Sequence, residues 1–304
     1  MMAPERRKAV VFALALVLGV LVMAGGTSIP ASATDENDPD SLFLPVIVGS
    51  GEGGTLRPTA QPTGTRTPIP TETPEPTPHG MILIPAGEFQ MGCDINTDPY
   101  GCDIWGDIDQ LPLHKVSLSA YWIDKYEVTN ARYQACVDAG VCAAPGHTFS
   151  NTRHSYYGNP TYAEYPVIFV SWEKAKTFCN WEGKRLPTEA EWEKAARGST
   201  GTRAYPWGDA EPVCDLANFQ DCFQDSVGDT SAVGSHPAGA SPYGAMDMGG
   251  NVFEWVNDWY SEDYYASSPE NNPTGPVTGT FRVERGGSWF YASWSLRAAY
   301  RDFN

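Results

Sequence analysis

The last third of the chain, beyond Gly198, has almost no repeating apolar pattern. Its residues are mainly glycine, proline, aromatic and charged types, without the spacing of a buried helix or strand. Loops of this kind must be held by something other than helical and sheet hydrogen bonds. The sequence therefore predicts little regular secondary structure beyond Gly198.

One stretch of this part of the chain, residues 243–260, combines a glycine pair with aromatic rings and acids. It reads YGAMDMGGNVFEWVNDWY and carries the carboxylates of Asp247, Glu254 and Asp258. Two interpretations of these carboxylates are open. They are either solvated side chains on a glycine-broken turn, or oxygen ligands that fold the backbone around a hard cation.

The N-terminus has the pattern of an export signal. Three basic residues at 6–8 precede an apolar run over 9–24, and Ala31-Ser32-Ala33 fits a signal-peptidase site. A membrane anchor is the alternative, but the apolar run is short for a span. We therefore expect residues 1–33 to be a cleaved signal peptide. The mature protein is expected to be secreted or at the cell surface, outside the cytoplasm and without a membrane span.

Residues 34–80 are expected to form a disordered linker rich in threonine and proline. The part that reads RPTAQPTGTRTPIPTETPEPTPHG fits either an O-glycosylated stalk or an unmodified spacer. The apolar LFLPVIV at 42–48 is too short to cross a bilayer, and no role for it follows from the sequence. The composition changes at Met81, so residues 81–304 are predicted to form one domain.

The chain is strongly acidic. Its formal net charge is −17, and removal of residues 1–33 makes this charge more negative. Such a chain repels nucleic acid and anionic lipid, so neither is expected as a partner. The acidity serves either solubility or, in part, cation binding.

Seven cysteines in an exported chain predict disulfides. Short separations in the sequence suggest three pairs, and Cys179 is left over on the apolar stripe of a predicted helix. A buried thiol of this kind is usually inert. The expected pairs are Cys93 with Cys102, Cys136 with Cys142, and Cys214 with Cys222.

Three helices and several strands are predicted in the first half of the domain. Helix caps place two helices at 171–183 and 188–198, and a third is expected over 129–138. Two short strands are expected in MILIPAGEFQMG, about its Pro-Ala-Gly turn. The alternation in HKVSLSAYW predicts another strand, whose buried face would carry Val116, Leu118 and Ala120.

Seven motifs follow one another from Met81 to the last residue: MILIPAGEFQMG, YWIDKYEVTNARYQACV, YPVIFVSWEKAKTFCNWEGKRLPTEAEWEKAARG, YPWGD, ANF, SPYGAMDMGGNVFEWVNDWY and RVERGGSWFYASWSLRAAYRDFN. In this order they resemble the formylglycine-generating enzyme domain, also called the sulfatase-modifying factor family. The resemblance implies one compact α+β domain, related to the C-type lectin fold, with low regular secondary structure. The family usually ends in a strand with an Asn…Gly-Phe-Arg motif, so the domain is expected to be truncated at its C-terminus.

The resemblance also implies two structural calcium sites. Calcium prefers several oxygen ligands at once, and glycines allow the backbone to turn its carbonyls inward. A solvated turn remains the alternative at each site. The positions that match the family's calcium ligands are Asp247, Gly250, Val252 and Glu254 in one site, and Asn218, Phe219, Asp225 and Val227 in the other.

The family's copper site has no counterpart in the sequence. The family enzyme oxidises a cysteine of a sulfatase with O₂ and a copper(I) ion, which two cysteines just after the RGGS motif hold. Here Tyr291 matches the first cysteine, the second falls near Leu296, and the segment contains no cysteine. A phenol is a hard oxygen donor and leucine has no donor, so neither replaces a thiolate. Copper is therefore not expected, and oxidase activity is disfavoured.

Three functions are weighed on this basis. The favoured one is a calcium-stabilised binding protein without oxidase activity, whose partner is a peptide or a glycan. The alternatives are a family enzyme with another chemistry, of the non-haem iron oxygenase type, and an active formylglycine-generating oxidase. The binding groove would be lined by Trp289, Phe290, Tyr291 and Trp294, unless these rings belong to the core.

Overall fold

The chain divides into two units, Met1–Asp35 and Glu36–Asn304, and every described residue lies in the second. The predicted signal peptide and most of the predicted linker therefore lie outside the described residues. Within the part that is described, no helix has the length and apolar character needed to cross a membrane. The computed structural model describes residues 43–45, 48–49, 80–95, 102, 108–224 and 228–304.

The three predicted helices are confirmed, and their caps explain where they begin. They are α1 (Asn130–Asp138), α2 (Trp172–Trp181) and α3 (Glu189–Arg197). The side chains of their N-cap residues each accept a hydrogen bond from the first helical turn, and α3 has a complete capping box between Thr188 and Glu191. Short 3₁₀ segments η1 to η5 occupy Pro160–Tyr162, Gln220–Gln224, Pro237–Gly239, Tyr264–Ser267 and Ser293–Leu296.

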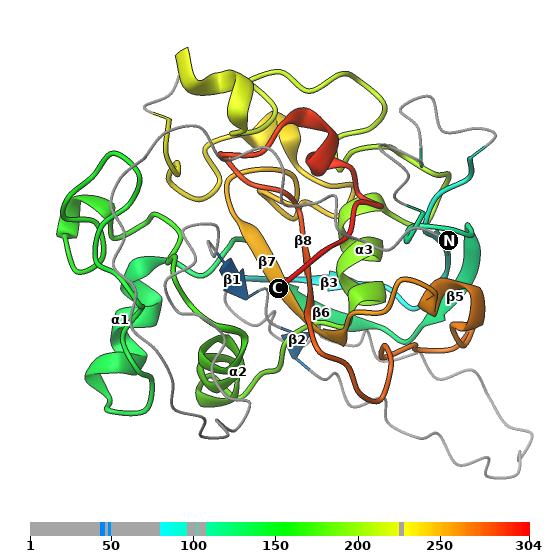
Figure 1. Ribbon diagram of the computed structural model, residues 1–304, viewed down its shortest axis with the longest axis horizontal. Helices are drawn as coiled ribbons and strands as arrows, with labels where there is room; N and C mark the ends of the chain where they lie inside the picture. The colour runs from blue at the N-terminus through cyan, green and yellow to red at the C-terminus, as the bar shows by residue number, and fades with distance from the viewer. Residues whose placement is uncertain (1–42, 46–47, 50–79, 96–101, 103–107, 225–227) are drawn as a thin grey trace, which may run out of the picture. The chain divides into compact units, whose positions relative to one another are not determined.

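The strands form three small sheets, with the orders β1-β7-β8-β9, β2-β6-β3 and β4-β5. Figure 1 shows β7 and β8 side by side, with α3 next to them. The small sheets and short helices confirm the predicted α+β class with low regular secondary structure. The strands are β1 (Phe43–Pro45), β2 (Val48–Gly49), β3 (Met81–Ile84), β4 (Gly87–Met91), β5 (His114–Leu118), β6 (Tyr121–Asp124), β7 (Phe253–Trp259), β8 (Arg282–Arg285) and β9 (Asp302–Phe303).

The apolar segment within the predicted linker forms β1 and β2. The first pairs in parallel with β7, and the second pairs antiparallel with β6. Both strands lie at the edges of their sheets. This part of residues 34–80 is therefore attached to the domain, which the sequence did not predict.

The strands of the first two motifs are confirmed, with one correction. β3 and β4 flank the predicted turn, but each pairs with a different strand, β6 and β5 respectively. Val116 and Leu118 are buried in β5 as expected. Ala120 is exposed in the turn between β5 and β6, because the strand ends at Leu118 and the alternation ends with it.

The core consists of two large apolar clusters that meet at β7. The first packs α1 and α2 against Phe253 and Trp255, and the second packs α3 against β3 to β6 and Val256. Successive residues of a strand point to opposite faces, so Glu254 lies on the same face as Val256. The carboxylate of Glu254 therefore faces α3 from within the core.

The three predicted disulfides are confirmed, with Cα atoms 5.7, 5.3 and 5.5 Å apart in sequence order. Cys179 is a free cysteine buried in the first apolar cluster, as expected. Burial raises the pKa of its thiol above the ordinary value, so it is held as an unreactive thiol.

Candidate cation loop and aromatic surface

The loop that leads into β7 has an unusual backbone. Asp247, Gly250 and Asn251 all adopt left-handed conformations, with φ of 58°, 92° and 61°. A Cβ atom at Gly250 would lie 2.5 Å from the carbonyl oxygen of Asn218, so only glycine fits there. The two segments that were predicted to hold calcium therefore lie against each other.

Three buried carboxylates surround this loop. Asp247 is 7% exposed, and Glu127 and Glu254 are each 1% exposed. Asp247 accepts a hydrogen bond from the Gly234 amide, and Glu254 accepts one from the Trp192 indole. Within the described part of the chain, none of the three pairs with a cationic side chain.

Burial raises the pKa of each of these three carboxylates. Burial raises the pKa of Asp247 to about 6. Burial also raises the pKa of Glu254 well above its ordinary value, and the charge of Asp247 adds to this rise. Glu127 has a raised pKa because of burial first and then the charges of Asp247 and Glu254. The cluster is a place where a cation would remove an electrostatic cost.

Glu127 was not predicted as part of this site. It lies between β6 and α1 and reaches the loop from 124 residues away in the sequence. Its Oε2 accepts a hydrogen bond from Asn251 Nδ2 at 2.7 Å, and its Oε1 accepts one from the Val252 amide at 3.2 Å. The motif YWIDKYEVTNARYQACV contains it, but nothing local marks it as different from a surface acid.

The second predicted site is only partly described. Asn218 is buried, and its Oδ1 has no hydrogen-bond partner among the described residues, whereas its Nδ2 donates to the Asp229 carbonyl at 2.9 Å. The Phe219 carbonyl accepts a hydrogen bond from the Cys222 amide at 2.9 Å. Asp225 and Val227 lie outside the described residues.

Asp258, the third carboxylate of the stretch 243–260, has a different role. It is buried and accepts a hydrogen bond from the backbone amide of Glu189 at 3.0 Å, at the first position of α3. A carboxylate at this end of a helix satisfies a free amide and complements the helix dipole. Asp258 therefore holds α3 against β7.

A cation at this loop would need more than one type of ligand. Among the residues described, no group of three or more His, Cys, Asp or Glu side chains is placed to hold a metal by itself. A cation at the loop would need backbone or amide oxygens as well, as calcium commonly does. One candidate is the carbonyl of Gly250, which no hydrogen bond reaches from the described part of the chain.

The predicted groove is not open as expected, and one of its residues needs correction. Trp289 is 3% exposed and belongs to the first apolar cluster, so its ring is part of the core. Tyr291 and Trp294 are partly buried against the same cluster. Of the four predicted rings, only Phe290 is largely exposed, at 44%.

An aromatic surface does exist beside this position. The Phe223 ring, 38% exposed, lies 6.0 Å from the Trp289 ring and 6.4 Å from the Phe290 ring. The Trp289 and Phe290 rings are 5.2 Å apart. We call these three residues the aromatic surface. The sequence did not single out Phe223.

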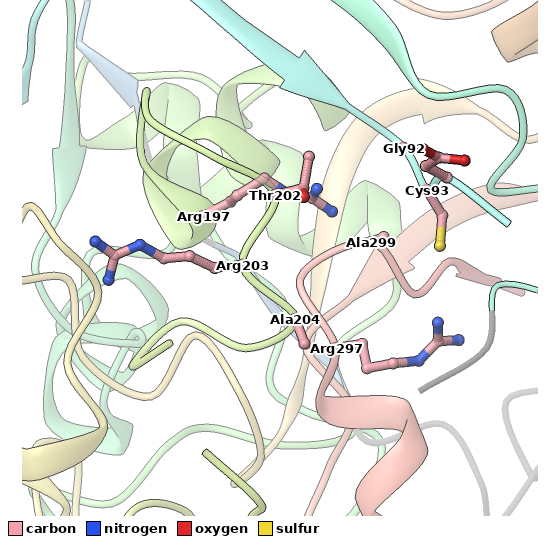
Figure 2. Close-up of a pocket in the computed structure, with 9 residues that line it drawn as sticks. Gly92, Cys93, Arg197, Thr202, Arg203, Ala204, Arg297 and Ala299 are labelled. Carbon is pink, nitrogen blue, oxygen red and sulfur yellow. The ribbon is translucent and has the colours of Figure 1, made fainter. Parts of the chain in front are cut away.

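A small cavity elsewhere does not provide a second site. Its volume is about 10 Å³, which is the space of one water molecule, and none of the predicted calcium ligands or groove residues lines it. Three arginines border it, but Figure 2 shows Arg203 and Arg297 extending in opposite directions. The guanidinium groups of these two residues therefore do not converge on one ligand.

The segment that corresponds to the family's copper site carries no sulfur. Leu296 is fully buried in a separate small apolar cluster, and the Tyr291 ring packs edge-on against Phe253 at 4.9 Å. Tyr291 and Leu296 thus serve packing. The one free cysteine in the described part of the chain, Cys179, is buried on α2.

Comparison with known proteins identifies the family of this chain. Residues 66–304 match the sulfatase-modifying factor enzyme 1-like domain. The formylglycine-generating enzyme of Streptomyces coelicolor is 36% identical over 275 residues, which cover 75% of this chain and 84% of that enzyme. The serine/threonine-protein kinase pkn1 of Chlamydia pneumoniae is 38% identical over 250 residues, which cover 77% of this chain but 37% of the kinase.

Comparison with a solved structure supports the same family. PvdO from Pseudomonas aeruginosa superposes with a TM-score of 0.59 and 28% sequence identity, over 74% of this chain and 87% of that protein. The matched segment begins at residue 66, before the predicted domain start at Met81. The chain therefore belongs to the sulfatase-modifying factor, or formylglycine-generating enzyme, family and has its fold.

Proposed function

We propose that this protein is an extracytoplasmic, calcium-stabilised member of the family that binds a peptide partner and does not oxidise cysteine. Three disulfides among the described residues support a location outside the reducing cytoplasm. The export pattern of residues 1–33 supports the same location. The family resemblance indicates which residues would bind calcium. The buried carboxylates of the loop would be stabilised by a bound cation.

Calcium at the loop is supported by the chemistry of its residues. Asp247 and Glu254 offer carboxylate oxygens in a buried setting, and Gly250 offers a carbonyl oxygen on a left-handed turn. Bound calcium would supply positive charge at this point, and it would hold the loop against the segment of Asn218. Its role is to stabilise the fold, since none of these groups lies on the aromatic surface.

The absence of oxidase activity follows from the ligands that the reaction needs. Copper(I) is held by soft sulfur donors, and no cysteine occurs between Arg285 and Asn304. Cys179 is buried in the first apolar cluster, where its thiol is not presented to a substrate. Other redox chemistry would need ligands that this segment does not offer.

The observation that carries the binding function is the aromatic surface. Phe223 and Phe290 are exposed side by side on the buried ring of Trp289. Exposed aromatic rings that cluster on a well-packed base are typical of protein recognition sites. Both exposed rings lack a polar group, which favours apolar peptide side chains over the hydroxyls of a glycan.

Binding to arrays of short synthetic peptides and of soluble glycans tests this function. Phe290→Ser and Phe223→Ser are expected to weaken peptide binding about tenfold or more, as loss of a central contact does. Phe281→Ser is the matched control, because Phe281 is 45% exposed and its ring lies against Phe303 instead. If the protein binds glycans and both variants lose that binding, the assignment of a peptide partner is wrong. The binding function itself is wrong if neither array is bound, or if both variants bind as the wild type does.

A further inference from the structure

We infer that the disulfide between Cys214 and Cys222 positions Phe223 in the aromatic surface, and that reduction of this disulfide by a dithiol weakens binding at that surface. The inference rests on the proposed peptide-binding function and adds a means of regulating it. Three observations carry it: the partial exposure of the Phe223 ring, the fixed position of the turn at Cys214, and the exposure of Cys214 itself.

The ring of Phe223 is not held in place by burial alone. Phe223 follows Cys222 in η2 and is 38% exposed. The centroid of its ring lies 6.0 Å from that of Trp289 and 6.4 Å from that of Phe290. A ring this exposed gains only part of the stabilisation of full burial. The position of Phe223 therefore depends on how the backbone of η2 is held.

A hydrogen bond and a disulfide link η2 to other segments of the domain. The Gln220 amide donates to the Tyr291 carbonyl at 3.0 Å, which joins the first residue of η2 to the segment of Phe290. Cys222 forms the disulfide with Cys214, with the two Cα atoms 5.5 Å apart. This covalent link lies at the residue directly before Phe223, so it fixes the backbone from which the ring extends.

The other end of the disulfide lies on a firmly packed turn. The amides of Leu216 and Ala217 both donate to the Val213 carbonyl, at 2.8 and 3.3 Å. Gly239 in η3 lies so close to this turn that a Cβ atom there would be 1.8 Å from the Leu216 carbonyl oxygen. The disulfide therefore connects η2 to a fixed part of the domain.

Exposure distinguishes this disulfide from the other two in the described part of the chain. Cys214 is half-buried, whereas its partner Cys222 and the four cysteines of the other disulfides are all buried. Exposed disulfides are the ones that exchange readily with external thiols. A small dithiol should therefore reduce this disulfide first.

The reduction is a thiol–disulfide exchange in which the dithiol is oxidised. A thiolate of the dithiol attacks the sulfur of Cys214, the S–S bond breaks, and Cys222 leaves as a thiolate that takes up a proton. The second thiol of the dithiol then attacks the mixed disulfide, which releases Cys214 as a thiol and closes the disulfide of the reductant. Two electrons and two protons pass to the protein, and η2 loses its covalent link to the turn.

Limited reduction of the purified protein tests the structural part of the inference. Dithiothreitol is added in steps, free thiols are trapped with iodoacetamide, and peptide mass spectrometry identifies them. Cys214 and Cys222 should be labelled before the other four bridged cysteines. Hydrogen exchange should then rise in residues 219–224 while α3 stays protected. Earlier opening of another disulfide, or unchanged exchange in residues 219–224, would overturn the inference.

Peptide binding tests the functional part, and the probe is the array peptide that the oxidised wild-type protein binds most tightly. Reduction and trapping should raise the Kd of this peptide about tenfold or more, as loss of a central contact does. The double variant Cys214→Ser with Cys222→Ser should have a similarly raised Kd, which dithiothreitol does not change further. An unchanged Kd in both the reduced protein and the double variant contradicts the inference.

Phe223→Ser is the matched control, because it separates an effect on this ring from a general loosening of the domain. If the disulfide acts through Phe223, reduction should leave the already raised Kd of Phe223→Ser unchanged. A further loss of affinity as large as that of the wild type would show that the disulfide acts elsewhere. If the oxidised wild type binds no peptide, the proposed function is wrong, and hydrogen exchange still decides whether the disulfide positions η2.

Discussion

Arg301 and Glu189 form an ion pair through two hydrogen bonds in the interior of the domain. Arg301 Nε donates to Glu189 Oε1 at 2.7 Å, and Arg301 Nη2 donates to Oε2 at 3.1 Å. The Arg301 side chain is 0% exposed and that of Glu189 is 2% exposed. Arg285 adds a third contact to Glu189 Oε1 at 3.3 Å. The pair joins the start of α3 to the segment before β9, so it fixes the last part of the chain to the core.

Loss of this pair should destabilise the protein strongly. Glu189→Gln leaves Arg301 and Arg285 buried with less compensating charge, and we expect a loss of about 3 kcal/mol in the free energy of unfolding. Urea denaturation measures this loss. Lys115→Ala is the control, because Lys115 pairs with Glu88 and Glu270 at the exposed surface, where water screens the pair. Equal losses of unfolding free energy in the two variants would show that the buried ion pair contributes no more to stability than the exposed one.

The same pair predicts how stability depends on pH. Burial alone would raise the pKa of Glu189, but Arg301 and Arg285 outweigh it and hold this pKa below its ordinary value of 4.5. A carboxylate with a lowered folded pKa stabilises the fold above its unfolded pKa, and this contribution is lost as pH falls through the folded pKa. The difference in melting temperature between wild type and Glu189→Gln should therefore be constant down to about pH 4.5 and shrink below it. A difference that does not shrink in acid contradicts this assignment.

Helices were predictable here because their signals are local. Ser171 and Thr188 accept hydrogen bonds from the turn that follows them, and Gly183 and Gly198 adopt the left-handed conformations that end α2 and α3. Short cysteine separations gave the disulfides for the same reason, since nearby residues are easily brought together. These features depend on a few neighbouring residues, so the sequence contains them.

Features that depend on tertiary context were not predictable. All nine residues of α3 are buried, including Glu189, Lys194 and Arg197, although charged residues usually mark an exposed face. Their partners lie on distant segments, such as Arg301. Glu127 was missed for the same reason. The segment of β1 and β2 was also missed, because strand pairing with β7 and β6 leaves no mark in a short apolar run.

Cys179 should resist modification in the folded protein. Its thiol is buried and has a raised pKa because of burial, so the reactive thiolate is scarce and shielded. Iodoacetamide should label no cysteine of the native protein, and it should label Cys179 alone after unfolding without reductant. Peptide mass spectrometry gives the labelled position. Native labelling of Cys179, or its appearance in a disulfide, contradicts the arrangement described above.

The protein should not generate formylglycine. A cysteine-containing sulfatase peptide incubated with the protein, O₂ and copper(I) should remain unoxidised at its cysteine, because the segment from Arg285 to Asn304 has no thiolate to hold copper. Mass spectrometry with an aldehyde-reactive probe measures the product. An active bacterial formylglycine-generating enzyme serves as positive control. An aldehyde product above the level without protein would mean that this protein holds copper by other ligands.

The calcium loop can be weakened without changing its shape. Glu254→Gln keeps the size of the side chain and removes its charge, so it should reduce the thermal shift that calcium causes. Its melting temperature in chelator should stay close to that of the wild type or rise, since Glu254 is buried without a cationic partner in the described part of the chain. Differential scanning calorimetry in both buffers gives the two values. A fall that is equal in both buffers would assign Glu254 to packing alone.

The most direct test of the central claim is the melting temperature of the wild-type protein in calcium and in excess chelator, together with metal analysis of the purified protein. Calcium at about a hundredfold above its Kd should add about 2.7 kcal/mol to stability. This corresponds to an increase of roughly 5–11 °C in melting temperature, with calcium bound and copper absent from the purified sample. Equal melting temperatures in the two buffers, with no calcium bound, would contradict the claim and leave Asp247 and Glu254 as ordinary buried acids.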